Sequence, residues 1–133
     1  MFPEYDNRPG QVTLITVTNT NSDQSGGRVP NGSVRLHLKY VDAATCLIAD
    51  AFETFTPNDT LTADARIHTP NSTRGYMFCY AVGITNAAPI TFDHLVGTSI
   101  VFDGMNQATY ALQPIVFQGR TAPGTSTNVD GDG

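Results

Sequence analysis

Apolar and polar residues alternate strictly between Ser33 and Val41, and this pattern limits the fold more than any other stretch of the chain. Such alternation is typical of a β-strand that buries one face, because successive side chains of a strand point to opposite faces. The strand therefore belongs to a sheet that is covered on one face only. The residues predicted to face the core are Val34, Leu36, Leu38 and Tyr40, and those predicted to face outward are Arg35, His37 and Lys39.

The rest of the chain up to residue 117 is predicted to form further short strands, separated by turns rich in Pro, Gly and Asn. We find no convincing helical period in it. About eight strands without significant helix predict an all-β fold, a single antiparallel β-sandwich that is either immunoglobulin-like or jelly-roll-like. Residues 1–117 are the predicted domain, and the Gly, Thr and Asp-rich residues 118–133 are a predicted tail or linker.

Several strand assignments carry details that a structure can test. The apolar face changes within residues 12–20, which predicts either a β-bulge or a fully buried segment near residues 14–15. Residues 60–67 alternate and are predicted to form one strand. Residues 76–82 are apolar on both faces, so we place them at the centre of a sheet, and residues 97–98 are expected to separate two short strands.

The composition points to an exported protein. Only 14% of the 133 residues are charged, the net charge is -5, and Lys39 is the single lysine. A chain of this charge cannot neutralise a run of phosphates, so nucleic acid is excluded as a partner. No apolar run approaches the length of a membrane-spanning helix. We expect an extracellular or cell-surface location, with the leader peptide outside this chain because Met1–Glu4 has no basic and apolar regions.

The end of the chain contains half of a calcium-binding pattern. Asn128, Asp130 and Asp132 place oxygen ligands at alternate positions with glycines between them, as in the first half of an EF-hand-type loop. The bidentate carboxylate of such a loop would lie beyond Gly133. Two interpretations stay open, a flexible tail in this chain and a calcium site in a longer one, and a domain of this size needs no metal to fold.

The three histidines do not form a catalytic or metal-binding pattern. His37 lies between two cationic side chains on one strand face, and His68 lies in a turn. His94 follows Asp93 directly, so strand alternation would send the two side chains to opposite faces. We therefore predict that the protein is not an enzyme, since a hydrolase would need a histidine and an acid to meet in one pocket.

The two cysteines allow two interpretations. Cys46 and Cys79 form an even count, which permits a disulfide in an exported domain. Alternatively, Cys79 is a small buried hydrophobic residue and Cys46 is a free thiol in a hairpin.

Aromatic residues bear on carbohydrate binding. The chain contains no Trp, and Tyr40, Tyr76, Phe78 and Tyr80 lie on apolar strand faces, so we expect core positions for them. A surface patch of two or more tyrosines would favour a carbohydrate-binding module. Burial of these tyrosines and of Tyr110 would count against it.

Several short segments are familiar as a set, in the order Phe2–Gly10, Val17–Thr20, Thr56–Thr60, Gly75-Tyr76 with Tyr80-Ala81, and Phe92–Gly97. This series resembles β-sandwich segments of large, uncharacterised exported or surface proteins of Gram-negative bacteria, which are often followed by Asp/Gly-rich, calcium-type sequence. The resemblance extends over most of the chain up to Phe117. It implies an extracellular habitat and a β fold, and it implies no activity.

Taken together, these patterns favour a non-catalytic extracellular structural or adhesive module. Its expected partners are other copies of itself or other domains of a longer chain. A carbohydrate-binding module of a larger secreted protein is the alternative, and a capsid-type jelly roll is the second alternative. In this acidic chain Arg35, His37 and Lys39 form a small basic island, which is either a docking face for an acidic surface or a solvated strand face.

Overall fold

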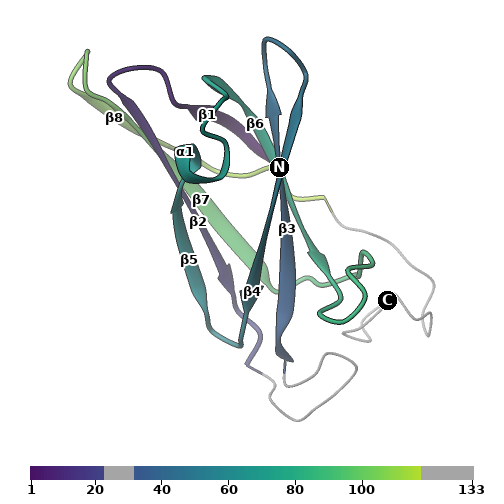
Figure 1. Ribbon diagram of the computed structural model, residues 1–133. Coiled ribbons are helices and arrows are strands. Elements are labelled where there is room, and N and C mark those ends of the chain that lie inside the picture. Colours follow the sequence, from purple (N-terminus) through teal and green to yellow (C-terminus); the bar gives the residue numbers. More distant parts are fainter. Residues whose placement is uncertain (23–31, 118–133) are drawn as a thin grey trace.

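The computed structural model describes residues 1–22 and 32–117, which form a sandwich of two four-stranded antiparallel sheets (Figure 1). The predicted all-β sandwich is confirmed. Sheet A has the order β1 (Phe2–Asp6), β6 (Arg74–Val82), β3 (Val34–Asp42) and β4 (Ile48–Phe55). Sheet B has the order β5 (Thr60–Asp64), β2 (Gln11–Asn19), β7 (Leu95–Asp103) and β8 (Ala108–Leu112). The helical turn α1 (Ala65–His68) follows β5.

Strand β3 supplies the central row of the core, as its alternation predicts. Its four inward side chains, Val34, Leu36, Leu38 and Tyr40, are each at most 1% exposed. Burial of a Val or Leu side chain contributes about 1.5–3 kcal/mol, so the three aliphatic residues of this row together contribute roughly 5–9 kcal/mol. The strand lies between β6 and β4, which leaves only its outward side chains free to meet a ligand.

Strand β2 is regular, and neither the predicted bulge nor the alternative fully buried segment occurs near residues 14–15. Buried and half-buried residues alternate along the whole strand, and its pairing with β7 runs without a register shift. The face that packs inward includes three polar residues, of which Thr13 and Asn19 are fully buried and Gln11 is 8% exposed. A register shift occurs instead in β1, between Phe2 and Tyr5.

The predicted strand at residues 60–67 is too long. β5 ends at Asp64, whose carboxylate accepts a hydrogen bond from the Arg66 main-chain N–H and caps α1. Asp side chains often accept hydrogen bonds from nearby main-chain N–H groups, and such a bond stabilises the first turn of a helix in place of a longer strand.

The predicted break at residues 97–98 is absent, because β7 continues through both positions. A Cβ atom on Gly97 would lie 2.7 Å from the Thr16 carbonyl oxygen and 2.8 Å from Cζ of Phe2. Glycine at this position therefore allows β7 to pack closely against its neighbours. Close packing, like a break in the strand, is a common reason for a glycine within a strand pattern.

In the described ranges, the structure contains no helix long and apolar enough to cross a membrane.

Candidate functional site

The outer face of sheet A carries three cross-strand rows of side chains. The register of β3 with β6 and β4 sets these rows, and side chains directly opposite each other on neighbouring strands lie within contact range. The rows are Tyr80–His37–Phe52, Phe78–Lys39–Asp50 and Tyr76–Val41–Ile48. Aromatic rings and polar groups thus share one flat face.

A hydrogen-bonded chain links the polar members of these rows. The hydroxyl of Tyr80 lies 2.9 Å from Nδ1 of His37, and Nε2 of His37 lies 2.5 Å from Oδ1 of Asp50. Lys39 donates to the same Asp50 oxygen over 2.8 Å. The bonds from Lys39 and His37 stabilise the carboxylate and lower the pKa of Asp50. Asp50 therefore offsets part of the positive charge that the sequence assigns to this stripe.

Two further contacts fix the rings beside this chain. The imidazole of His37 stacks on Phe52 with 4.1 Å between ring centroids. The guanidinium carbon of Arg35 lies 4.4 Å from the centroid of the same ring, a cation–π contact. Because each ring has neighbours on its own face of the sheet, the side chains are held in place before any ligand arrives.

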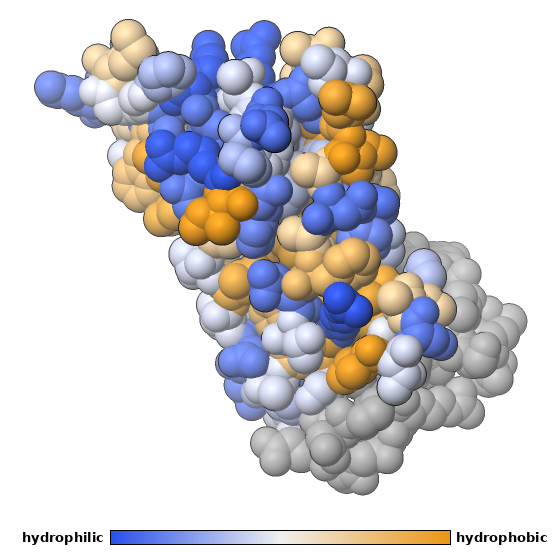
Figure 2. All heavy atoms as spheres, in the orientation of Figure 1, coloured by the Kyte–Doolittle hydropathy of each residue, from blue (hydrophilic) through white to orange (hydrophobic). Residues whose placement is uncertain are grey.

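Three of the four aromatic residues predicted to lie in the core are in fact on the outer face of sheet A. Tyr76 and Phe78 are each 36% exposed and Tyr80 is partly exposed, whereas Tyr40 is 1% exposed as predicted. The sandwich has only two layers, so the outward side chains of β6 have no third layer to cover them. Hydrophobic residues reach the surface at several places among hydrophilic ones, as the view in Figure 2 shows.

The remaining candidate residues do not assemble into a catalytic or metal centre. Nδ1 of His68 lies 2.8 Å from the hydroxyl of buried Tyr40, and its Nε2 lies 3.7 Å from Glu53. The ring of His94 packs edge-on against Phe92 with 5.4 Å between centroids. Over residues 1–22 and 32–117, no group of three or more His, Cys, Asp or Glu side chains is placed to hold a metal ion.

His37 does meet an acid, Asp50, which the sequence reasoning missed. The pair lies on the outer sheet face and not in the pocket described below. The hairpin between β3 and β4 places Asp50 opposite Lys39, so a search for opposite charges across this hairpin would have found it. The prediction that the protein is not an enzyme stays a prediction.

Cys46 and Cys79 are both free thiols, so the disulfide alternative is wrong. Cys46 is exposed in the turn between β3 and β4 and has a positive φ of 58°, while Cys79 lies in β6. Desolvation raises the pKa of the Cys79 thiol to about 12, which favours the protonated thiol over the thiolate at neutral pH. The predicted calcium ligands, Asn128, Asp130 and Asp132, lie outside the described residues, as does the predicted tail at 118–133.

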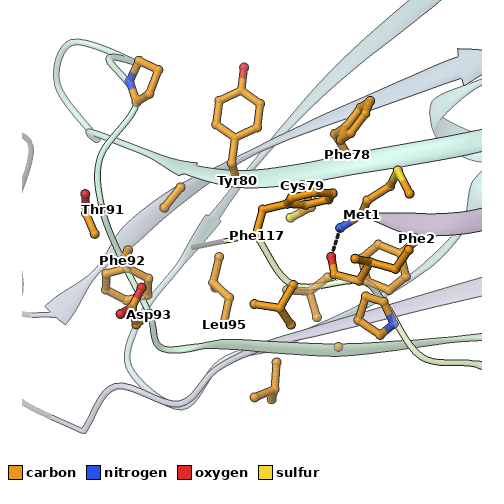
Figure 3. A pocket seen from close by; sticks show the side chains of 18 of the residues that line it. Met1, Phe2, Phe78, Cys79, Tyr80, Thr91, Phe92, Asp93, Leu95 and Phe117 are labelled. Atoms are coloured by element: carbon orange, nitrogen blue, oxygen red, sulfur yellow. Dashed lines mark hydrogen bonds between the residues drawn. The ribbon is translucent and has the colours of Figure 1, made fainter. Parts of the chain in front are cut away.

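A pocket of about 540 Å³ lies beside β6, near the start of β7 (Figure 3). Figure 3 shows Phe78, Cys79 and Tyr80 along one side of the pocket, with Met1 and Phe2 at one end and Thr91 and Phe92 at the other. Its volume lies within the range of small-molecule sites, roughly 300–1,000 Å³, and most of its lining is apolar. No local pattern predicts this pocket, because its lining joins residues far apart in the sequence, such as Met1 and Phe117.

Comparisons of the chain with protein-family models, with curated proteins and with solved structures found no match.

Proposed function

We propose that the chain is a non-catalytic adhesive module of an extracellular protein, and that the outer face of sheet A binds carbohydrate. The observation that carries this proposal is the partial exposure of Tyr76, Phe78, Tyr80 and Phe52 beside a fixed chain of hydrogen-bonding groups. Exposure of at least two tyrosines is what the sequence argument required of a carbohydrate-binding module.

The chemistry of the face suits a sugar. A pyranose has an apolar face of C–H groups and an equatorial rim of hydroxyls, so it needs aromatic surface and polar partners together. The rings of Phe78 and Tyr76 on β6 meet edge to face with 5.5 Å between centroids. Lys39 on β3 lies opposite Phe78, and Asp50 on β4 lies opposite Lys39. Because the polar groups are already hydrogen-bonded to each other, little ordering entropy opposes binding.

A second candidate function is a structural module that docks this face onto a neighbouring protein. The observation in its favour is Arg35, whose guanidinium lies over Phe52 and makes no ion pair with the residues that the structure describes. Exposed Tyr, Phe and Arg are the residues that most often anchor protein interfaces. Since Asp50 binds both His37 and Lys39, attraction to an acidic partner would depend mainly on Arg35.

Affinity electrophoresis tests the carbohydrate proposal. The wild type is run through gels that contain a neutral β-glucan, an arabinoxylan or polygalacturonate, and retardation is compared with a gel without polysaccharide. We expect retardation by at least one polymer, and we expect Tyr76→Ala and Phe52→Ala to weaken it at least tenfold. Loss of about 1.5 kcal/mol per stacked ring gives a factor of this size.

The chain offers matched control variants on sheet B. Phe102 is 39% exposed, as is Phe52, and Tyr110 at 40% matches Tyr76 at 36%. Phe102→Ala and Tyr110→Ala should therefore leave retardation unchanged. Absence of retardation by all three polymers, or equal losses in both pairs of variants, would contradict carbohydrate binding on sheet A. Light scattering of the wild type and of Arg35→Glu then tests the docking alternative.

A further inference from the structure

Strand β8 forms one edge of sheet B (Figure 1). It pairs with β7 on one side, and among the residues that the structure describes no strand lies on its other side. Residues 108–111 are all exposed, so both faces of the strand are accessible as well as its free edge. An accessible strand edge is a template for pairing with another chain.

The other three edge strands carry features that oppose such pairing. Charged side chains, Pro residues and bulges keep an edge strand from accepting a further strand. β1 contains Pro3, Glu4 and a register shift. β4 contains Asp50 and Glu53, and β5 ends in Asp64 before α1. β8 has the sequence Ala-Thr-Tyr-Ala-Leu, without a charge, a Pro or a register shift, so it is the unprotected one of the four edges in the described ranges.

Two hydrogen bonds, one beyond each end of β7, show which side each of its residues faces. The His94 carbonyl accepts a hydrogen bond from the Thr20 N–H over 2.7 Å, directly before β7 begins. The Gly104 N–H donates to the Gly10 carbonyl over 2.8 Å, directly after β7 ends. Residues two apart in a strand direct their main-chain groups to the same side. The even-numbered residues of β7 therefore face β2, and the odd-numbered ones face β8.

The main-chain groups of Thr109 and Ala111 consequently point to the free edge of β8. Val101 of β7 is odd-numbered and lies opposite Tyr110, so the main-chain groups of Tyr110 face β7. The residues on either side of Tyr110 direct their groups the other way. β8 thus offers two N–H donors and two C=O acceptors to a further strand.

We propose that β8 pairs antiparallel with β8 of a second copy of the chain, which joins the two copies of sheet B into one eight-stranded sheet. Tyr110 is the middle residue of β8, so a register that sets Tyr110 opposite Tyr110 of the second copy pairs all five residues. In this register Thr109 of each copy lies opposite Ala111 of the other. Each of these two pairs exchanges two hydrogen bonds, which uses every donor and acceptor on both free edges.

A second copy suits this edge because the strand is complementary to itself. A two-fold axis beside Tyr110 relates the two strands, so the contact is isologous and closes at two copies. The acidic residues that give the chain its net charge of -5 lie outside β8, so no like charges meet between the paired strands. The outer face of sheet A belongs to the other sheet and stays open in both copies, so this association does not depend on the proposed function.

Light scattering after size-exclusion chromatography tests the association, over a wide range of protein concentration and under reducing conditions because Cys46 is exposed. The measured mass should rise with concentration from one copy to two and stop there. Thr109→Pro removes an N–H that faces the free edge and leaves the bonds to β7 in place. By symmetry this change deletes two of the four bonds between the copies, so the dissociation constant should rise at least tenfold.

Thr54→Pro is the matched control on the edge strand β4. The Asp42 N–H donates to the Leu47 carbonyl over 2.9 Å, so the odd-numbered residues of β4 face β3 and the Thr54 N–H faces a free edge. Thr54 is also exposed, and its replacement should leave the association unchanged. A wild type that stays monomeric at every concentration, or an equal effect of both variants, would overturn the proposal.

Tyr110→Cys tests the register. Opposite residues without hydrogen bonds between them have Cα atoms about 4.5 Å apart, within the range that a disulfide spans. In a Cys46→Ser background, mild oxidation should link Tyr110→Cys into dimers but not Phe102→Cys, which is 39% exposed one strand away on β7. Equal linking in both variants, or none in Tyr110→Cys, would contradict pairing through β8. Phe52→Ala should not weaken the association, and a loss there would place the interface on sheet A instead.

Discussion

Asn19 holds three segments together at one end of the sandwich. Its side chain is completely buried at the end of β2. Nδ2 donates to the Gly32 carbonyl over 3.1 Å and to the Thr56 carbonyl over 3.0 Å, while Oδ1 accepts from the Asn21 N–H over 3.0 Å. The amide thus joins β2 to the segment before β3 and to the turn after β4, and we predict that its loss is costly.

The cost of Asn19→Ala follows from these bonds. Each lost hydrogen bond contributes about 0.5–1.5 kcal/mol, and a carbonyl left buried without a donor costs about 1–3 kcal/mol. The Thr56 carbonyl keeps a second donor, the Asp59 N–H at 3.1 Å, so only the Gly32 carbonyl is left without one. We expect the free energy of unfolding to fall by about 2–5 kcal/mol, against a total of about 5–15 kcal/mol for a protein of this kind.

Asn19→Asp tests the same bonds without changing the shape of the side chain. The carboxylate keeps the acceptor but turns two donors into a negative charge that faces two carbonyl oxygens. Burial and repulsion would raise the pKa of this Asp in the folded state above its unfolded value of about 3.9. A raised folded pKa stabilises the protein below the unfolded pKa and is lost as pH rises through the folded one. This variant should therefore be closer to the wild type at pH 4 than at pH 7.

Urea unfolding followed by circular dichroism measures these changes. Asn71→Ala is the control, because Asn71 is exposed in the turn before β6, and it should stay within about 0.5 kcal/mol of the wild type. If Asn19→Ala also stays within that range, or if Asn19→Asp is as stable as the wild type at pH 7, the three bonds do not stabilise the fold as argued.

Two further predictions concern sheet A. A Cβ atom on Gly75 would lie 1.9 Å from the Val41 carbonyl oxygen, so Gly75→Ala should lower soluble yield and stability sharply, whereas Gly83→Ala meets only a movable side chain and should cost less. Hydrogen bonds from Arg8 lower the pKa of Asp6 in the folded state, so this carboxylate stabilises the fold above its unfolded pKa and loses that effect as pH falls through the folded one. Asp6→Asn should therefore be most destabilising at pH 7 and should cost progressively less as the pH is lowered below the unfolded pKa in urea titrations, and a cost independent of pH would contradict this.

The strand pattern was predictable where one physical cause dominates. Along β3 the alternation reports burial on one side only, and the four inward residues were assigned correctly for that reason. At Asp64 a local capping bond competes with the same alternation, and the alternation alone could not show which would prevail. At Gly97 the reason for glycine is contact with Phe2, a residue far away in the sequence.

The candidate site was predictable only in part. Arg35, His37 and Lys39 were placed outward by alternation, but their charge balance depends on Asp50, which joins them through the register of a hairpin. The pocket beside β6 depends on contacts between residues far apart in the sequence, such as Met1 and Ile115. Local patterns carry no information about contacts of that range.

Strand β6 lies inside sheet A between β1 and β3, as its apolar run predicts, but its outward aromatic residues are not buried. A run that is apolar on both faces normally indicates burial on both faces. In β6 the inward residues Met77 and Ala81 do lie in the core, but the side chains of Phe78 and Tyr80 face outward beside Lys39 and His37. A strand whose outward face carries exposed aromatic residues can be apolar on both faces without a third layer. Its composition therefore indicates contact with a ligand or a second chain as directly as it indicates a central position in a sheet.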